Sequence, residues 1–165
     1  MTGRIYVRCL AAYNNGILHG KWIDTSTDED EMLDEIKELL RTSPIKGAEE
    51  WAIHDYEDFP ASFGEYPSLK KIAHFEDFIE ENKHVIREDL IAIYQDDPNN
   101  VDMERLAGIF EEFSDYSNER ADEMLAMHEI PDEVRGYFDY DAYERDMKLG
   151  MHVIDVPSGV AVFYQ

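Results

Sequence analysis

Apolar and polar residues alternate over residues 4–9, and a similar alternation returns over residues 49–59. A period of two is typical of a strand that buries one face. Between these segments, residues 21–24 (Lys-Trp-Ile-Asp) are interpreted as a returning strand, which follows an Asn-Asn-Gly stretch at 14–16. Asn and Gly tolerate the backbone conformations of tight turns. The pattern therefore predicts a hairpin followed by a third strand.

The apolar spacing changes to that of a helix over residues 28–41. Thr27 is positioned to cap the helix N-terminus, and Pro44 marks the end of the element. The first third of the chain is thus predicted to be a three-stranded sheet with one helix. Cys9 falls on the inward side of the first strand, which favours a small core thiol over a nucleophile.

The next forty residues are predicted to be helical. Apolar stripes at helical spacing cover residues 69–79 and 85–94, and the second stripe ends at a break at 96–100. A boundary with the preceding sheet is expected near Pro60, because proline and glycine are concentrated there.

Beyond the break, the spacing of Leu106, Phe110 and Phe113 predicts a helix. A second helix is predicted over residues 121–128 and is stopped by Pro131.

A last helix is predicted near residues 140–147, before two β-rich runs that flank a Pro-Ser-Gly turn. The breaks along the chain predict three units, at residues 1–61, 62–103 and 104–165.

Composition adds a strong charge to this picture. The chain of 165 residues has 38 acidic and 15 basic residues, which gives a net charge of −23 and a pI near 4.4. Aromatic residues make up 12%, which favours a folded core over disorder. All three predicted units are acidic, with net charges of −7, −6 and −10 in chain order. Because nucleic-acid binding depends on clustered Lys and Arg, we expect no direct binding to nucleic acid or to anionic membranes.

The sequence also predicts a compartment. No run approaches the roughly 18 to 20 apolar residues of a membrane span. One cysteine cannot form an internal disulfide, and Arg4 and Arg8 interrupt the apolar core that a signal peptide needs. We expect a cytoplasmic protein with no membrane attachment.

Residues 24–35 have the acid spacing of a calcium-binding loop, but Glu29 occupies the position where the sharp turn needs glycine. Acids at a helix N-terminus interact favourably with the helix dipole, and we favour this interpretation. The six histidines lack the spacing of a zinc protease, and phosphate-binding glycine loops are absent from the sequence. We expect no metal and no cofactor.

Candidate catalytic groups have little support. His19 and the asparagines at 14–15 are residue types that a turn also uses, and we interpret them as part of a turn. Paired carboxylates are so frequent in this chain that no pair marks the site of a hydrolase. We do not expect an enzyme, although a carboxylate-based hydrolase is an open alternative.

The acidic runs are more informative. Carboxylates three or four residues apart on a helix repel one another, so runs such as 76–81 and 111–115 carry an energetic cost. A solvated acidic face is the plain explanation. However, 23 charges correspond to about 39 Å of duplex DNA at one charge per about 1.7 Å. On charge alone, the chain carries enough carboxylates to imitate a length of DNA.

Three segments carry a family resemblance: YVRCLAAYNNGILHGKWID at 6–24, EEWAIHDYEDFP at 49–60 and DYDAYERDMKLGMHVIDVPSGVAVFYQ at 139–165. They resemble the ArdA family of antirestriction proteins, and the similarity runs nearly from end to end. Members of that family are DNA mimics encoded by mobile genetic elements. They inhibit Type I restriction-modification enzymes by occupying the DNA-binding groove.

The resemblance implies an elongated α+β protein of three units that dimerises through its C-terminal unit. In this arrangement the N-terminal unit is a three-stranded sheet with a helix, the central unit is helical, and the C-terminal unit is α+β. The opening segment is then the hairpin of the N-terminal unit and not a catalytic loop.

The resemblance also implies a partner, the methyltransferase core of the Type I enzyme, and an acidic partner-binding segment within residues 104–146. We expect the phosphate-mimicking residues to be Glu76, Asp77, Glu80, Glu81, Glu88, Asp89, Glu111, Glu112, Asp115, Glu119, Asp122 and Glu123. The aromatic candidates for the dimer interface are Tyr116, Tyr137 and Phe138. The alternative function is an acidic adaptor that binds another basic DNA-binding protein.

Overall fold

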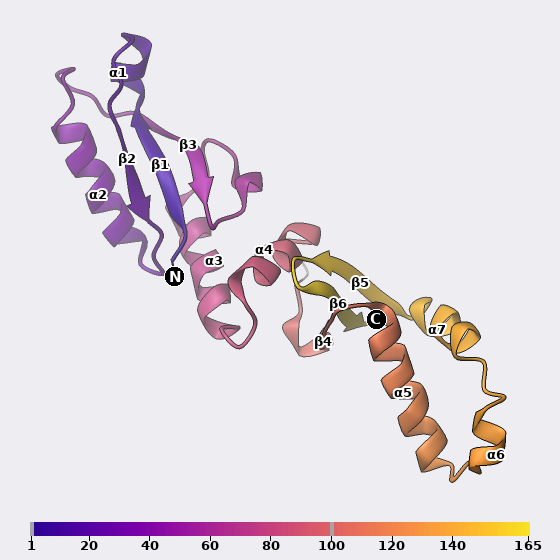
Figure 1. Ribbon diagram of the computed structural model, residues 1–165. Helices are drawn as coiled ribbons and strands as arrows, with labels where there is room; N and C mark the ends of the chain where they lie inside the picture. The colour runs from indigo at the N-terminus through magenta and orange to yellow at the C-terminus, as the bar shows by residue number, and fades with distance from the viewer. Residues whose placement is uncertain (1, 100) are drawn as a thin grey trace. The chain divides into compact units, whose positions relative to one another are not determined.

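The computed structural model describes residues 2–99 and 101–165 (Figure 1). Within these residues the fold is α+β, with seven α-helices and two three-stranded antiparallel sheets. The chain divides into two compact units, unit 1 at Met1–Arg87 and unit 2 at Glu88–Gln165, and each contains one sheet. The predicted division into three units stays a prediction. The predicted break at 96–100 includes Asn100, which lies outside the described residues.

The sheet of unit 1 contains β1 (Arg4–Cys9), β2 (Gly20–Asp24) and β3 (Trp51–Glu57) in the order β2-β1-β3. All three strands were predicted, β1 and β3 from their alternating patterns and β2 as the strand that returns after the Asn-Asn-Gly turn. The first strand in the sequence is therefore the central strand, and it pairs with both of its neighbours.

The connection between β1 and β2 is more elaborate than the predicted hairpin turn. A short helix, α1 (Leu10–Asn14), follows β1 directly, and the turn forms at Asn15 and Gly16. The amide N–H of Gly16 donates to the carbonyl of Tyr13 at 2.9 Å, and the φ angle of Gly16 is +71°. Glycine fits this position because it adopts a positive φ without strain.

The core of unit 1 lies between the sheet and α2 (Glu29–Arg41). Ile5, Val7 and Cys9 alternate along the inner face of β1 and are fully buried, as the pattern predicted for Cys9. The N-cap of α2 is Asp28, whose carboxylate accepts from the amide of Asp30 at 2.9 Å, and not the predicted Thr27. A charged N-cap also interacts favourably with the helix dipole.

An aromatic cluster completes unit 1. It joins the segment around η1 (Ala61–Phe63) to α3 (Leu69–Glu81), which lies beside α2. The ring of Phe59 lies 4.8 Å from that of Phe63 and 4.7 Å from that of Phe75, in edge-to-face contacts. Such pairs contribute about 0.5–1.5 kcal/mol beyond the area that they bury.

Unit 2 contains the remaining elements, of which α4 starts at the last residue of unit 1. In chain order they are α4 (Arg87–Asp96), η2 (Met103–Arg105), β4 (Leu106–Phe110), α5 (Phe113–Met127), α6 (Asp132–Arg135), α7 (Tyr140–Lys148), β5 (Met151–Val156) and β6 (Gly159–Tyr164).

The predicted helix over Leu106, Phe110 and Phe113 is wrong. Residues Leu106–Phe110 form strand β4, and the helix that contains Phe113 begins only at that residue. A spacing of four residues satisfies a strand as well as a helix, so the short apolar run was ambiguous. The predictions for α3, α4, α7 and the hairpin of β5 and β6 agree with the structure.

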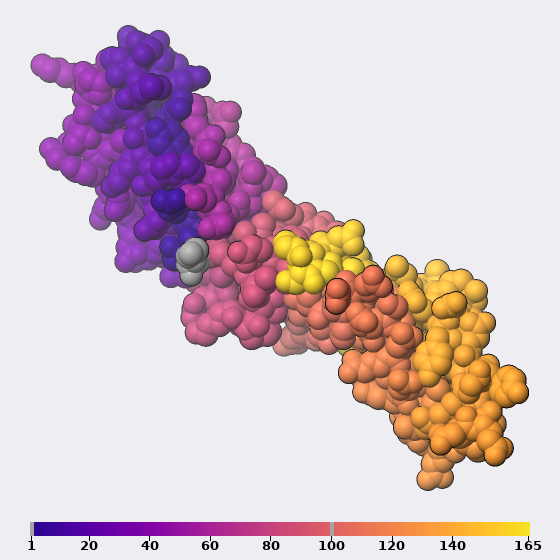
Figure 2. Space-filling model, viewed as in Figure 1, coloured from indigo at the N-terminus to yellow at the C-terminus, as the bar shows by residue number. Residues whose placement is uncertain are grey.

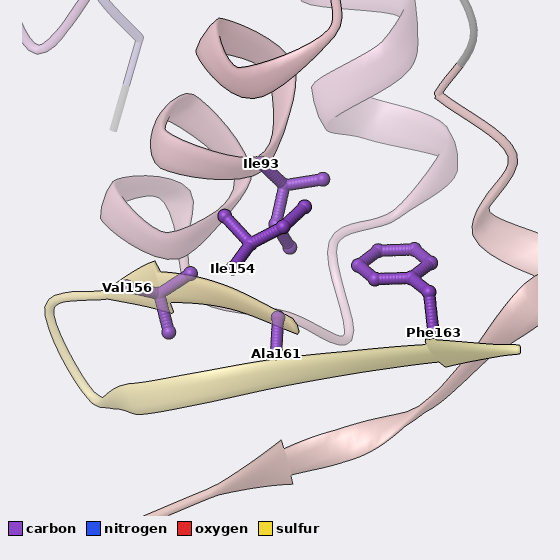
Figure 3. Close-up of a cluster of buried hydrophobic side chains, with 5 residues drawn as sticks. All are labelled: Ile93, Ile154, Val156, Ala161 and Phe163. Carbon is purple, nitrogen blue, oxygen red and sulfur yellow. The ribbon is translucent and has the colours of Figure 1, made fainter. Parts of the chain in front are cut away.

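Helices cover both faces of the sheet in unit 2, whose strand order is β4-β6-β5. On one face, Ile93 of α4 packs against Ile154, Val156, Ala161 and Phe163 from β5 and β6 (Figure 3). The opposite face carries the second core cluster, which contains Phe113, Tyr116 and Val162 with the partly buried Met147. These residues come from α5, β6 and α7, so the sheet is buried on both sides.

The turn between β5 and β6 requires a glycine. The φ angle of Gly159 is +137°, and a Cβ atom at this position would lie 2.1 Å from the carbonyl oxygen of Phe110. Any side chain here would collide with the backbone that leads out of β4.

Candidate acidic interaction surface

Almost all acidic side chains of the protein are exposed. Glu76 and Asp89 are buried, Glu144 is partly buried, and every other Asp and Glu is exposed. The charge is unequal between the two units. Unit 1 has 18 acidic and 10 basic residues, for a net charge of −8, whereas unit 2 has 20 and 5, for a net charge of −15.

The sequence of α5 explains why its acids point outward. The helix buries Phe113, Tyr116, Ser117, Ala121 and Leu125, which recur every three or four residues and form one stripe. The start of this stripe, Phe113 and Tyr116, packs on the sheet of unit 2, and α5 also lies against α7. The remaining positions of the helix are partly or fully exposed.

The exposed side of α5 carries Asp115, Glu119, Asp122 and Glu123, which we call the α5 acidic stripe. Its residues follow the i, i+4, i+7, i+8 spacing of one helix face, and at 1.5 Å per residue they span about 12 Å of helix axis. Glu111 and Glu112 are also exposed and directly precede the helix. Six of the predicted partner-binding acids therefore follow one another along a single segment.

Few positive charges compensate the α5 acidic stripe. Arg120 is the basic residue of α5, and it forms an ion pair with Glu123. Asp122 accepts a hydrogen bond from the hydroxyl of Tyr140 at 2.6 Å, and this bond raises the pKa of Tyr140. Asp115 accepts from the amide of Glu112 at 3.0 Å, which also stabilises the start of the helix.

The acids predicted on α3 divide into two groups. Asp77, Glu80 and Glu81 are exposed, and Glu80 pairs with Lys83 at 2.6 Å. Glu76 points inward from the same helix and is only 5% exposed. Three of the four α3 candidates are thus available to a partner.

Glu76 has a structural role in unit 1. Arg87 donates two hydrogen bonds to its carboxylate, from Nη1 to Oε2 at 3.0 Å and from Nη2 to Oε1 at 2.6 Å. The hydroxyl of Thr25 also donates to this carboxylate, and Arg87 Nε donates to the carbonyl of Asp58 at 2.8 Å. Because the carboxylate is fully engaged and buried, Glu76 does not belong to the exposed surface that was predicted for it.

Asp89 is excluded from the surface for a similar reason, while its neighbour Glu88 is exposed. The side chain of Asp89 is 2% exposed and accepts a hydrogen bond from the amide of Ser158 at 3.0 Å. It therefore holds the turn between β5 and β6 instead of presenting a charge to solvent.

The aromatic candidates for a dimer interface lie in different surroundings. Tyr116 is 3% exposed and its ring packs 5.1 Å from that of Phe110, so it belongs to the core of unit 2. Burial also raises the pKa of Tyr116. Phe138 is partly buried against Tyr140, whereas Tyr137 is 89% exposed. Among the three, Tyr137 is the side chain that is open to contact.

Residues of the opening segment that could suggest a polar site are used by the fold. A ring nitrogen of His19 lies 2.8 Å from the carbonyl oxygen of Leu39. The side-chain amide of Asn15 donates to the carbonyl of Ala11 at 2.8 Å. These bonds hold the α1 connection in place, which agrees with the interpretation of the segment as a turn.

Residues 24–35 do not form a calcium loop, because they cover the end of β2 and the first half of α2. Within residues 2–99 and 101–165, no group of three or more His, Cys, Asp or Glu side chains is placed to hold a metal ion. No helix in the same residues is long and apolar enough to span a bilayer.

The structure adds acids that were not among the predicted partner-binding residues. After α5, the chain carries five further exposed carboxylates as it passes through α6 and enters α7: Glu129, Asp132, Glu133, Asp139 and Asp141. In Figure 2 the segment from α5 to α7 forms one continuous orange surface within unit 2. The high acid content of residues 129–141 was visible in the sequence, but it gave no periodic signal.

Comparison with known proteins identifies one family. The family described as antirestriction protein (ArdA) matches residues 5–162, which is nearly the whole chain. No curated protein matches the sequence. The family match implies an antirestriction function and an interaction with restriction-modification enzymes, which is the action of an inhibitor protein.

Proposed function

The chain belongs to the ArdA family of antirestriction proteins, and from this premise we propose that it acts as a DNA mimic. In this proposal its acidic surface occupies the DNA-binding groove of Type I restriction-modification enzymes and competes there with DNA. The methyltransferase core is the proposed binding partner, because this part of the enzyme must hold DNA in a basic groove.

The α5 acidic stripe is the observation that carries the proposal. Four carboxylates over about 12 Å of helix correspond to one carboxylate per about 4 Å, and Arg120 pairs with the last of them, Glu123. A single strand of duplex DNA carries one charge per about 3.4 Å of axis. A basic groove that accommodates a DNA strand would therefore meet a similar density of negative charge along α5.

The balance of charge in unit 2 supports the same proposal. With 20 acidic and 5 basic residues, most of its carboxylates have no cation of the chain to neutralise them. A basic groove could neutralise them instead, with release of bound counterions from both surfaces. Complementary fields of this kind also accelerate the encounter of the two proteins.

We further propose that the protein is a homodimer, is encoded by a mobile genetic element and acts in the cytoplasm. A dimer would double the charge that is presented to the enzyme. Tyr137, with 89% of its surface exposed, is the aromatic residue most available to such an interface. The proposed activity requires binding alone and no catalytic group.

The test is a competition experiment with a purified Type I methyltransferase and a labelled DNA duplex. The protein is titrated into the complex at several salt concentrations, and the released duplex is measured. We expect stoichiometric displacement at low salt that weakens as the salt concentration rises, because salt screens the charges that bind.

Two results would contradict the proposal. Absence of displacement at low salt by the folded protein would exclude competition for the groove. Equal displacement of DNA from several unrelated DNA-binding proteins would favour the alternative, a general acidic adaptor for basic proteins.

A further inference from the structure

The first part of unit 1 differs in charge from the rest of the chain. Residues 2–23 contain Arg4, Arg8 and Lys21 but no acidic residue, and the first carboxylate is that of Asp24. Arg4 and Lys21 each form an ion pair with a glutamate of unit 1. Arg8 has neither an ion pair nor a side-chain hydrogen bond with any residue that the structure describes.

Two tyrosine rings hold Arg8 in place. Its guanidinium carbon lies 5.3 Å from the ring centroid of Tyr6 and 5.5 Å from that of Tyr13. The Nε atom of Arg8 is buried and has no hydrogen-bond partner in the described residues. This buried atom is closed to a ligand, but Arg8 as a whole is only partly buried, so a carboxylate could accept from the terminal N–H groups of the guanidinium.

The face around Arg8 is aromatic and open. Alternation along β1 places Tyr6 and Arg8 on the side of the sheet opposite the buried Ile5 and Val7. The ring of Trp22 lies 5.3 Å from that of Tyr6. We define the Arg8 face as Tyr6, Arg8, Tyr13, Trp22 and His54, whose imidazole ring lies 5.1 Å from the ring of Tyr13. Tyr13 is 48% exposed and Trp22 is 36% exposed.

The acidic cross-strand partners on this side of the sheet lie toward the other end of β1. Asp24 and Glu57 are the cross-strand neighbours of Arg4, and Asp55 is a neighbour of Tyr6. The cross-strand neighbours of Arg8 are Gly20 and Ala52, which carry no charge. Arg8 therefore has no charged cross-strand partner and forms no ion pair with a residue that the structure describes.

We propose that the Arg8 face binds a carboxylate group on the surface of the target enzyme, beside the groove that the acidic surface enters. The proposal rests on the proposed function. The planar guanidinium matches a carboxylate with two parallel hydrogen bonds. Arg, Tyr and Trp are also the residues that most often dominate the energy of protein interfaces. The contact would fix the position of the inhibitor along the groove, which evenly distributed charge cannot do alone.

Replacement of Arg8 distinguishes this contact from long-range attraction, because the two explanations predict opposite changes in the affinity for the methyltransferase. If only net charge mattered, the removal of one positive charge would strengthen binding to a basic groove. If Arg8 contacts a carboxylate, Arg8→Ala weakens binding. Lys46 provides a matched control, because it lies in unit 1, is exposed and has no ion pair with a described residue.

The experiment measures direct binding to a purified Type I methyltransferase by calorimetry and, in parallel, displacement of a labelled duplex. We expect Arg8→Ala to weaken direct binding at least tenfold and Lys46→Ala to leave it equal or stronger. Arg8→Lys should give an intermediate loss, because lysine keeps the charge but not the planar fork. Thermal unfolding of each variant establishes that the fold is retained.

The outcomes distinguish the two proposals. Equal binding by Arg8→Ala and Lys46→Ala overturns the Arg8 contact, even when the wild type displaces DNA as a mimic should. If direct binding depends on Arg8 but the protein displaces no DNA, the proposed Arg8 contact is supported and the proposed DNA mimicry is contradicted. The contact is also contradicted if Lys46→Ala loses as much binding affinity as Arg8→Ala. The same holds if both Arg8 variants lose affinity because they unfold.

Discussion

The two units of the protein use similar frameworks but treat their charges differently. Each has a three-stranded antiparallel sheet with helices packed on it. In unit 1, ion pairs join acids to bases along α2, across the sheet and in the buried network of Glu76 and Arg87. In unit 2, the acids outnumber the bases four to one, and the carboxylates of the α5 acidic stripe face solvent.

This difference shows that the number of acidic residues alone does not locate an interaction surface. An acid that is buried and paired stabilises its own unit, whereas an exposed acid without a nearby cation raises the energy of the free protein. A partner that neutralises the second kind relieves the repulsion. Among the described residues, each unit has one buried acid, Glu76 in unit 1 and Asp89 in unit 2, and we propose that the acids that bind the partner lie mainly in unit 2. The predictions below test how the two units differ.

The largest expected effect is on the stability of unit 1. Glu76→Gln removes the charge that Arg87 neutralises and leaves a buried guanidinium without a counter-ion. Breaking a buried pair costs about 3–5 kcal/mol. Denaturant unfolding followed by tryptophan fluorescence measures the change, because both tryptophans, Trp22 and Trp51, lie in unit 1.

Asp77→Asn is the control for this prediction. Asp77 is exposed on the same helix, and its replacement should change the free energy of unfolding by less than about 0.5 kcal/mol. If the two variants unfold at the same denaturant concentration, Glu76 is not the structural acid that its geometry indicates.

The second prediction concerns inhibition. The triple variant Asp115→Asn, Glu119→Gln and Asp122→Asn neutralises most of the α5 acidic stripe without changing side-chain size. We expect the concentration for half-displacement of the duplex to rise more than about tenfold, which corresponds to about 1.4 kcal/mol. The fold should be retained, because the amide oxygens of the new asparagines can still accept the hydrogen bonds of Asp115 and Asp122. The loss of like charges also relieves repulsion.

A triple variant in unit 1 tests whether placement or total charge matters. Glu49→Gln, Glu50→Gln and Glu65→Gln remove the same charge from exposed positions of that unit. We expect less than about a threefold change in displacement, a difference of about 0.7 kcal/mol. If the two triple variants lose the same ability to displace the duplex, net charge alone governs binding. The proposed difference between the two units would then be wrong.

The third prediction is a pH dependence in unit 1. Burial raises the pKa of Tyr56 to about 12, and its hydroxyl donates to the carbonyl of Gly64 at 2.5 Å. Unfolded tyrosine loses its proton near pH 10, so its contribution to stability is complete below pH 10 and is lost as the pH rises toward 12.

Tyr56→Phe should cost about 1 kcal/mol at neutral pH, because one hydrogen bond is lost. It should also reduce the decline in stability between about pH 10 and 12. Tryptophan fluorescence again reports on unit 1 alone. An unchanged slope above pH 10 in the variant would mean that Tyr56 does not control this decline.

The smallest expected effect is that of a single charge. Glu111→Gln removes one exposed carboxylate next to α5, and we expect displacement of the duplex to change less than about twofold, or about 0.4 kcal/mol. Complete loss of inhibition by this folded variant would falsify a mechanism based on distributed charge.

Much of the fold could be predicted from the sequence, because strong periodic patterns coincide with the real elements. The alternation in residues 4–9 and the helical stripe in 28–41 reflect burial on one face, and burial decides both structures. The strand at Leu106–Phe110 was missed because five apolar residues fit two periods equally well. Helix α1 was missed because a short helix before a turn has too few residues to show a stripe.

The candidate surface was predictable only in part. The spacing of the acids on α5 follows directly from the sequence, whereas the burial of Glu76 depends on Thr25, which is 51 positions away in the chain. Asp89 is buried through a contact with Ser158, 69 positions away. Contacts of such sequence separation leave no local pattern, so charge alone suggested that both residues belong to the surface. The Arg8 face was missed for the same reason, since its rings come from three separate strands and a helix.

The position of β6 in its sheet has a consequence for synthesis of the chain on the ribosome. In unit 1 the central strand is the first to be made, so its partners can pair as they emerge. In unit 2 the central strand is Gly159–Tyr164, and β4 and β5 have no pairing partner until these residues appear. The nascent chain will then hold a folded N-terminal unit and an unfolded, highly acidic segment. Domains fold as units during translation, so the proposed interaction surface of unit 2 can assemble only after β6 has emerged.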